Sequence, residues 1–327
     1  MSNKNLLSGR DKELQELAEQ YEAAMSENKP FYQDADELAD LADWYGTKKR
    51  YDKAFEIAEY GLKLHPDSTE LMIEYAYLHL DNGKKAKARE IIENLPDTYS
   101  PEAKVVRAHL LLSEGKLDDA EQLLDTIEDK ADLANVVDVS YMYLDMGYPD
   151  KALAWLDPVK EEYSDEEAYI AVVADCLYGK GMTEEAIPLY NRLIDMNPYS
   201  APYWFGLARC HFEEMNFNQA IDACDYALVG DDEFADAYVM KGHCFYQLGN
   251  EDAALEYYQK AEELHGLAPE FIYTYIGLCK VSKGEWKEGY ENLEKAILEN
   301  ETDEIASPIL PSLYANAGLC LSKMGKK

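Results

Sequence analysis

The sequence predicts an all-α protein built from about eight consecutive helix-turn-helix units. Small residues pair at a spacing of twelve residues, and the first members of successive pairs lie 32 to 35 residues apart. A glycine usually stands five residues before the second member of a pair, where a break between two helices needs positive φ. A period of this length with two helices per unit indicates a repeat solenoid.

Each pair of small residues marks a helix crossing, because two helices approach closely only where the side chains between them are small. Large apolar residues surround the pairs at helical spacing, as Trp204 and Leu207 do around Ala208. The eight pairs are Ala42 and Ala54, Ala76 and Ala88, Ala108 and Ala120, Ser140 and Ala152, Ala174 and Ala186, Ala208 and Ala220, Gly242 and Ala254, and Gly277 and Gly289.

The turn inside each unit is predicted from glycines at one repeated position, namely Gly83, Gly115, Gly147, Gly181, Gly249 and Gly284. Two units depart from this pattern and carry Lys49 and Met215 instead. Two steps in the region of units two to four are only 32 residues long. We expect the connecting turns there to be tighter.

Two segments resemble the tetratricopeptide repeat (TPR). They are 201–232, with W-F-G-L-A-R-C-H-F and F-N-Q-A-I-D-A-C-D-Y-A-L, and 238–264, with G-N-E-D-A-A-L-E-Y-Y-Q-K-A. Pro66 and Pro198 match the proline that ends the family's repeat. The resemblance covers about residues 35 to 300. It implies a right-handed superhelical solenoid, with first helices lining an inner groove, and a role in binding other proteins.

The two ends of the chain are predicted to differ from the repeats. Residues 1–34 are expected to form an N-terminal capping helix, with an amphipathic pattern over 10–27, followed by a loop. Residues 35–310 hold the eight repeats, and an acid-rich loop is expected near 299–311. Residues 311–327 are expected to form a terminal helix with Gly318 at the small position, either as a cap or as the start of a truncated ninth repeat.

The charge of the chain excludes some classes of partner. The formal net charge is −34, from 65 acidic and 31 basic residues. Nucleic-acid binding depends on neutralising phosphates with Lys and Arg, and anionic membranes attract basic surfaces, so neither partner is expected. Steering by long-range charge favours a basic protein partner. No apolar run of signal-peptide or membrane-span length occurs, so a cytoplasmic location is expected.

No motif in the sequence predicts catalysis, a cofactor or a metal. Phosphate-loop, dinucleotide and zinc-protease motifs do not occur in the sequence. Five of the six cysteines stand two residues after the first small residue of their units, where a small apolar side chain fits a tight core. They are Cys176, Cys210, Cys244, Cys279 and Cys320, and all six thiols are expected to be reduced, without metal.

The candidate ligand site is the inner face of the first helices. Inward side chains are expected one residue after the small residue, three before it and four after it, which places them on one helical face. Aromatic residues recur there, and they are typical of binding surfaces. The predicted peptide-groove residues are Tyr77, His109, Tyr141, Tyr178, Phe205, Arg209, Phe212, His243 and Tyr246.

The leading functional prediction is a scaffold or adaptor, not an enzyme, that binds a peptide or helix of another protein in this groove. One alternative is a self-assembly module that joins copies through exposed terminal helices. Another is the regulatory or interaction part of a larger protein that is truncated here. The rival reading of the groove aromatics is that they only pack against the second helices.

Overall fold

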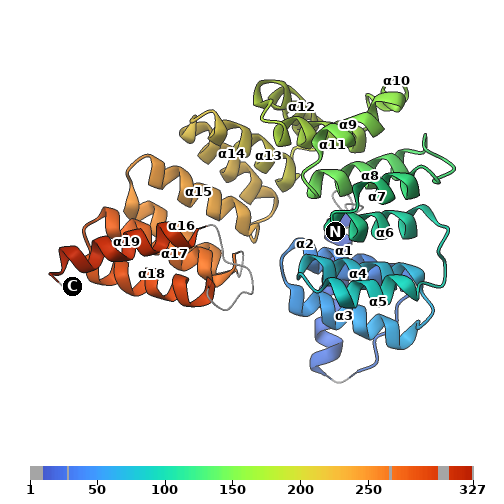
Figure 1. The fold of residues 1–327 in the computed structure, drawn as a ribbon, viewed down its shortest axis with the longest axis horizontal. Helices are drawn as coiled ribbons and strands as arrows, with labels where there is room; N and C mark the ends of the chain where they lie inside the picture. Colours follow the sequence, from blue (N-terminus) through green and yellow to red (C-terminus); the bar gives the residue numbers. More distant parts are fainter. Residues whose placement is uncertain (1–9, 28, 265–266, 301–308, 326–327) are drawn as a thin grey trace. The chain divides into compact units, whose positions relative to one another are not determined.

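A computed structural model describes residues 10–27, 29–264, 267–300 and 309–325. Within them every regular element is a helix (Figure 1), which confirms the predicted all-α repeat fold. The first unit to be described below contains α1 (Arg10–Ser26), α2 (Ala35–Thr47), α3 (Tyr51–Leu64), α4 (Thr69–Asp81), α5 (Lys85–Glu93), α6 (Pro101–Ser113), α7 (Leu117–Leu124), α8 (Leu133–Asp145), α9 (Pro149–Leu156), the 3₁₀ turn η2 (Asp157–Val159), α10 (Lys160–Tyr163), α11 (Glu167–Gly179) and α12 (Thr183–Met196). The second contains α13 (Ala201–Glu213), α14 (Phe217–Gly230), α15 (Ala235–Gln247), α16 (Glu251–Glu263), α17 (Pro269–Ser282), α18 (Trp286–Asn300) and α19 (Leu310–Lys323).

The chain forms two compact units, residues 1–198 and 199–327. In the first unit a first helix packs on the second helix of its own pair and on the next first helix, as α2, α4, α6 and α8 do. Residues 1–9 and most of the loop predicted near 299–311 lie outside the described residues. The division at residues 34 and 310 into cap, repeats and terminal helix stays a prediction.

The small-residue pairs lie where the helices of a pair cross. Ala42, Ala54, Ala208 and Ala220 have no exposed surface. In the fourth pair the hydroxyl of Ser140 donates a hydrogen bond to the carbonyl of Ala152 over 3.2 Å. A Cβ on Gly242 would lie 2.5 Å from Cε1 of Tyr258, so only glycine lets this ring cross α15. The spacing of twelve residues between two small residues therefore reflects direct contact between the two helices of a pair.

The turn between the helices of a pair has one repeated geometry. The predicted glycines all have φ between 70° and 78°. Lys49 and Met215, which replace glycine at the same position, have φ of 58° and 59°. The backbone geometry is thus set by the packing of the two helices, and these two residues adopt a conformation that L side chains disfavour by about 1–2 kcal/mol.

Replacing Met215 by Gly is expected to stabilise the chain by about 1 kcal/mol, because glycine adopts positive φ without the Cβ penalty. The Met215 side chain is 75% exposed, so little burial is lost. The control is Leu248→Gly, an exposed residue just before a turn glycine, whose φ is −79°. Urea unfolding should shift to higher concentration for Met215→Gly and to lower concentration for Leu248→Gly. A shift of both variants in the same direction contradicts the strain argument.

The shorter period of the middle units arises in the second helices and not in tighter turns. The helices α5 and α7, which belong to the two 32-residue steps, have 9 and 8 residues, whereas α12, α14 and α16 have 14, 14 and 13. The turns inside the units keep the same positive-φ geometry in both groups, with Met215 in place of glycine before α14. The connections between units, 94–100 and 125–132, are longer than 197–200 and 231–234 in the second unit and its boundary. The expectation of tighter turns is therefore wrong. A short 3₁₀ turn and the four-residue α10, which were not predicted, follow α9.

The N-terminal helix α1 covers the first pair. Leu14, Ala18 and Tyr21 are buried against α2 and α3. The Tyr21 hydroxyl donates to Glu56 over 3.1 Å, and the Tyr45 hydroxyl donates to Glu22 over 2.9 Å. The contacts of α1 thus bury apolar side chains of the first helix pair.

All six cysteines are free and buried. Burial raises the pKa of the Cys176, Cys244 and Cys279 thiols to about 12. These thiols therefore remain protonated at neutral pH and behave as small apolar core groups. Among the described helices, none has the length and apolar character needed to cross a bilayer.

Candidate functional site

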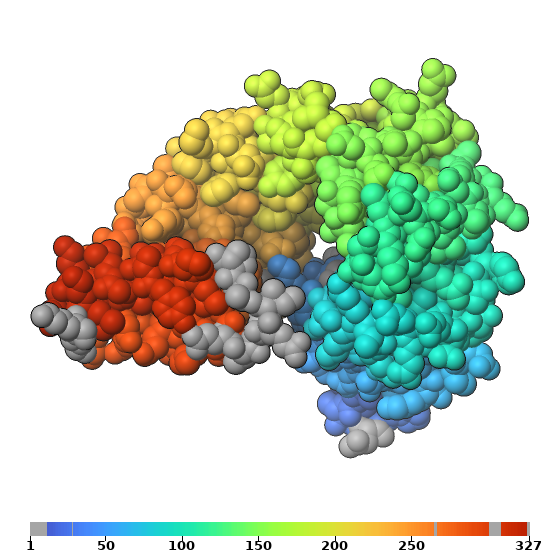
Figure 2. All heavy atoms as spheres, viewed as in Figure 1, coloured from blue at the N-terminus to red at the C-terminus, as the bar shows by residue number. Residues whose placement is uncertain are grey.

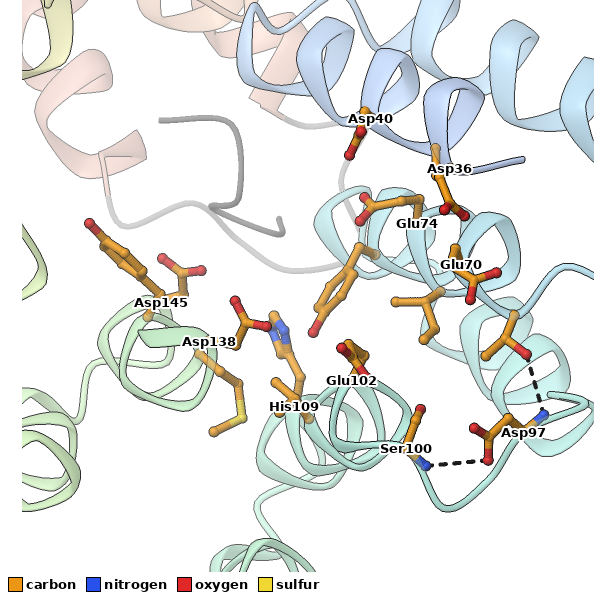
Figure 3. A pocket seen from close by; sticks show the side chains of 17 residues that line it. Asp36, Asp40, Glu70, Glu74, Asp97, Ser100, Glu102, His109, Asp138 and Asp145 are labelled. Atoms are coloured by element: carbon orange, nitrogen blue, oxygen red, sulfur yellow. Dashed lines mark hydrogen bonds between the residues drawn. The ribbon is translucent and has the colours of Figure 1, made fainter. Parts of the chain in front are cut away.

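A cavity of about 490 Å³ opens in the first unit. Its lining comes from the first helices α2, α4, α6 and α8 and from the segment before α6, and the labelled side chains of Figure 3 gather around one space. Eight carboxylates line it, while its described lining residues include no Lys or Arg. They are Asp36, Asp40, Glu70, Glu74, Asp97, Glu102, Asp138 and Asp145.

The carboxylates reach the cavity because they repeat at fixed places before the small residues. Asp36 and Asp40 lie six and two residues before Ala42, and Glu70 and Glu74 lie six and two residues before Ala76. A spacing of four places both members of a pair on the same face of a helix. Stacking of α2, α4, α6 and α8 then brings these faces side by side and forms a negative wall.

The predicted residues Tyr77, His109 and Tyr141 line the same cavity, each one residue after the small residue of its helix. They are largely buried, with exposed fractions of 7–8%. The rings of Tyr77 and His109 lie 5.7 Å apart at 53°. Burial lowers the pKa of His109 to about 4, so its imidazole is neutral at pH 7 and adds no positive charge to the cavity.

Asp145 is a cavity carboxylate whose pKa is raised into an accessible range. The surrounding protein displaces water from it, and Asp81 and Asp175 add repulsion, so its pKa rises to about 6. An opposite charge brought into the cavity favours the ionised form of such a group. A cationic ligand is therefore expected to lower this pKa.

Tyr141 also connects the cavity to the next pair of helices. Its hydroxyl donates to Asp175 Oδ2 over 3.4 Å, and the hydroxyl of Tyr190 donates to Asp175 Oδ1 over 2.7 Å. Asp175 on α11 is thus held by tyrosines from α8 and α12. This network fixes the orientation of the Tyr141 ring at one end of the cavity.

A second, apolar cavity of about 360 Å³ lies in the second unit. The predicted residues Phe212, His243 and Tyr246 line it, together with Gln247, Tyr258, Tyr275 and Leu278. The hydroxyl of Tyr258 lies 2.8 Å from Nδ1 of His243, and the rings of Tyr258 and Tyr275 stack 5.1 Å apart. Burial lowers the pKa of His243 to about 4, so the imidazole that pairs with the Tyr258 hydroxyl is neutral at pH 7.

The remaining three predicted residues do not line either cavity. Tyr178 is half-buried on α11. Phe205 and Arg209 lie one helical turn apart on α13, where the guanidinium carbon stands 5.6 Å above the Phe205 ring. The Phe205 ring also packs edge-on against Phe234 at 5.3 Å. The structure therefore brings the nine predicted residues together as two separate groups of three and leaves three outside them.

Sequence reasoning missed the carboxylates and the two tyrosines of the second cavity. The repeated acids two and six residues before the small residue were a signal that could have found the first group. Tyr258 comes from a second helix and reaches the cavity across Gly242. No group of three His, Cys, Asp or Glu residues within the described parts of the chain is arranged to hold a metal ion.

Two family models match parts of the chain. Residues 47–108 match the tetratricopeptide repeat, and residues 179–261 match subunit 3 of the anaphase-promoting complex, or cyclosome. Among curated proteins, none matches the chain significantly.

Several solved structures match the chain. A tetratricopeptide-repeat protein of Parabacteroides merdae is 18% identical with a TM-score of 0.52, over 75% of this chain and 98% of that one. A thermophilic TPR protein of Thermus thermophilus is 17% identical with a TM-score of 0.47, over 58% of this chain and all of that one. The hetero-tetramer Cut9–Hcn1 of the anaphase-promoting complex gives 20% identity and a TM-score of 0.49, over 95% of this chain and 69% of that one.

Proposed function

Since the chain is a tetratricopeptide-repeat protein, we propose that it is a non-catalytic scaffold that binds a basic peptide or helix of a partner protein in the acidic cavity of its first unit. The observation that carries this proposal is the set of eight carboxylates around that cavity. Lys and Arg side chains form charge-assisted hydrogen bonds with such groups, and these are the stronger hydrogen bonds of proteins.

The apolar part of the cavity supports a peptide more than a simple cation. Ile73, Val105 and Tyr77 line the cavity together with the carboxylates. Long basic side chains place their methylene groups on apolar surface and their charged heads near acids, and Tyr rings attract cations over their faces. The cavity therefore offers both kinds of contact that a Lys- or Arg-containing segment needs.

The second unit adds an apolar contact site. Phe212, Tyr246 and Tyr275 leave a cavity in which an aliphatic or aromatic side chain of a bound protein would lose its contact with water. The match of residues 179–261 to a family named for a subunit of a protein complex supports the scaffold role.

The test is selection of displayed random peptides on the immobilised full chain. The expected outcome is enrichment of Lys and Arg among the selected peptides. A parallel selection on the Glu74→Gln/Asp138→Asn variant, which keeps side-chain size, should lose this enrichment. Selected peptides that are neutral or acidic, or that bind the variant equally well, contradict the proposal.

Binding of a basic peptide is expected to strengthen as the pH rises through about 6. Asp145 has a pKa of about 6 in the free chain, so at pH 5 a cation must first displace its proton, whereas at pH 7.5 the carboxylate is already ionised. His109 stays neutral over this range, because its pKa is about 4. Titration calorimetry at pH 5 and 7.5 measures the change, and Asp145→Asn should flatten it. Equal affinity of the wild-type chain at both pH values contradicts this expectation.

A further inference from the structure

The apolar cavity of the second unit is lined mainly by aromatic rings. Phe212 comes from α13, His243 and Tyr246 from α15, Tyr258 from α16 and Tyr275 from α17. In Figure 2 the residues of α15 and α17 form the orange part of the second unit. At about 360 Å³ the cavity has room for a ligand group of several heavy atoms. Rings from four helices therefore border one space.

These rings are inclined to one another. The planes of Phe212 and His243 differ by 50°, and those of His243 and Tyr275 differ by 77°. The centroids of the second pair lie 4.5 Å apart, so the two rings are in direct contact. The face of an aromatic ring carries partial negative charge and attracts a cation that lies over it. Walls that run in several directions can present more than one ring to the same cation.

Elsewhere the chain places its own cations over aromatic rings. The ammonium of Lys241 lies 4.1 Å from the centroid of the Tyr257 ring, and the ammonium of Lys295 lies 5.1 Å from that of Tyr273. Within the described residues, no lysine or arginine lies over a ring of the apolar cavity. The rings of the cavity thus remain available to a cation from outside the chain.

The charges around the apolar cavity favour a cation as well. The helix α16, which contributes Tyr258, carries five acidic residues against one lysine. Burial raises the pKa of Tyr246, with smaller contributions from Cys279 and Glu251. His243 is neutral at pH 7, because burial lowers its pKa to about 4, and so it does not repel a cation. The described lining of the cavity includes no Asp, Glu, Lys or Arg. A cation is therefore attracted to this part of the unit but meets no carboxylate inside the cavity.

We propose that the apolar cavity binds a trimethylammonium group, such as that of a trimethylated lysine or of choline. The ammonium of an unmodified lysine has three hydrogen-bond donors and needs acceptors, which the carboxylates of the first unit offer. A trimethylammonium group has no N–H. Its methyl groups make apolar contacts, while its charge is attracted to the ring faces. The proposal rests on the proposed function, in which this cavity is a contact site, and names the group that the cavity takes.

The experiment compares choline with 3,3-dimethylbutan-1-ol, its uncharged isostere with carbon in place of nitrogen, by titration calorimetry on the full chain. We expect choline to bind at least about ten-fold more tightly, because only the cation gains from the ring faces. The variant Tyr246→Leu loses one ring but keeps an apolar side chain. It should bind choline about five-fold more weakly and the alcohol with little change. The variant Tyr246→Phe, which restores the ring, should recover choline binding.

Two further comparisons locate the ligand and its source. The variant Glu74→Gln/Asp138→Asn alters only the acidic cavity and should leave choline binding unchanged, so failure of this proposal and failure of the proposed function are distinguishable. A peptide with one trimethyllysine is then compared with the same peptide carrying lysine. If the modified peptide binds more tightly than choline, the natural ligand is a modified protein. If choline binds more tightly, it is a small molecule.

Three results overturn the proposal. The first is that choline does not bind. The second is that the uncharged alcohol binds as tightly as choline or more tightly, since the cavity would then select apolar volume and not charge. The third is that Glu74→Gln/Asp138→Asn loses choline binding while Tyr246→Leu keeps it, which assigns the cation to the acidic cavity of the first unit.

Discussion

Replacing Ala208 or Ala220 by Leu is expected to lower the free energy of unfolding by about 1–3 kcal/mol, because three extra carbon atoms must enter a crossing that has no free space. Both alanines have no exposed surface and belong to α13 and α14, which pack directly on each other. Urea or thermal unfolding of the chain measures the effect.

The control for this substitution is Ala86→Leu on α5, which lies two residues before the buried Ala88 and is exposed. The same change of residue there adds no atoms to a helix crossing and should leave stability within about 0.5 kcal/mol of the wild type. An unchanged unfolding midpoint for Ala208→Leu and Ala220→Leu would show that these residues do not form the crossing.

Neutralising two cavity carboxylates is expected to lower the affinity for a basic peptide by about ten-fold or more per carboxylate. Hydrogen bonds to charged groups contribute about 1.5–3 kcal/mol, and 1.4 kcal/mol corresponds to a factor of ten in affinity. The variant is Glu74→Gln/Asp138→Asn, whose two side chains come from α4 and α8 and point into the cavity of Figure 3. Titration calorimetry with a peptide selected on the wild-type chain measures the loss.

The matched control is Asp118→Asn/Asp119→Asn on α7, which changes the net charge equally at exposed positions outside the cavity. We expect it to reduce the rate of association slightly through weaker long-range attraction and to leave most of the affinity in place. Equal losses in the two double variants would mean that total charge, and not the cavity, attracts the peptide.

Much of the fold could be predicted because one physical requirement repeats. Every helix pair needs small residues at its crossing and positive φ in its turn. Residues such as Ala208 and Ala220, together with the turn glycines, therefore predict the helix pairs. Lys49 and Met215 show that the packing requirement persists even where glycine is missing, since both adopt positive φ. The short α10 could not be predicted, because it repeats in no other unit and its four residues carry no helical period.

The candidate site was less accessible to sequence reasoning. In a chain with 65 acidic residues, the repeated positions of Asp40, Glu74 and Asp138 look the same as an ordinary solvated helix face. These carboxylates form one negatively charged surface only because the first helices stack side by side. Tyr258 illustrates a second difficulty, because its entry into the apolar cavity depends on the missing side chain of Gly242 and not on its own pattern.

The buried cysteines of the second unit can be used to measure its local unfolding. Five of the six thiols lie in this unit, on α13, α14, α15, α17 and α19, and all are buried. An alkylating reagent reaches such a thiol only when its helix transiently leaves the stack, so the labelling rate at each cysteine reports the local opening equilibrium. In an array where each repeat is held mainly by its neighbours, α19 has fewer contacts to lose among the described helices, since it packs mainly on α18 whereas α15 packs on α13, α14 and α16. Cys320 should therefore be labelled first, and the order of the other four would trace how cooperativity is distributed along the unit.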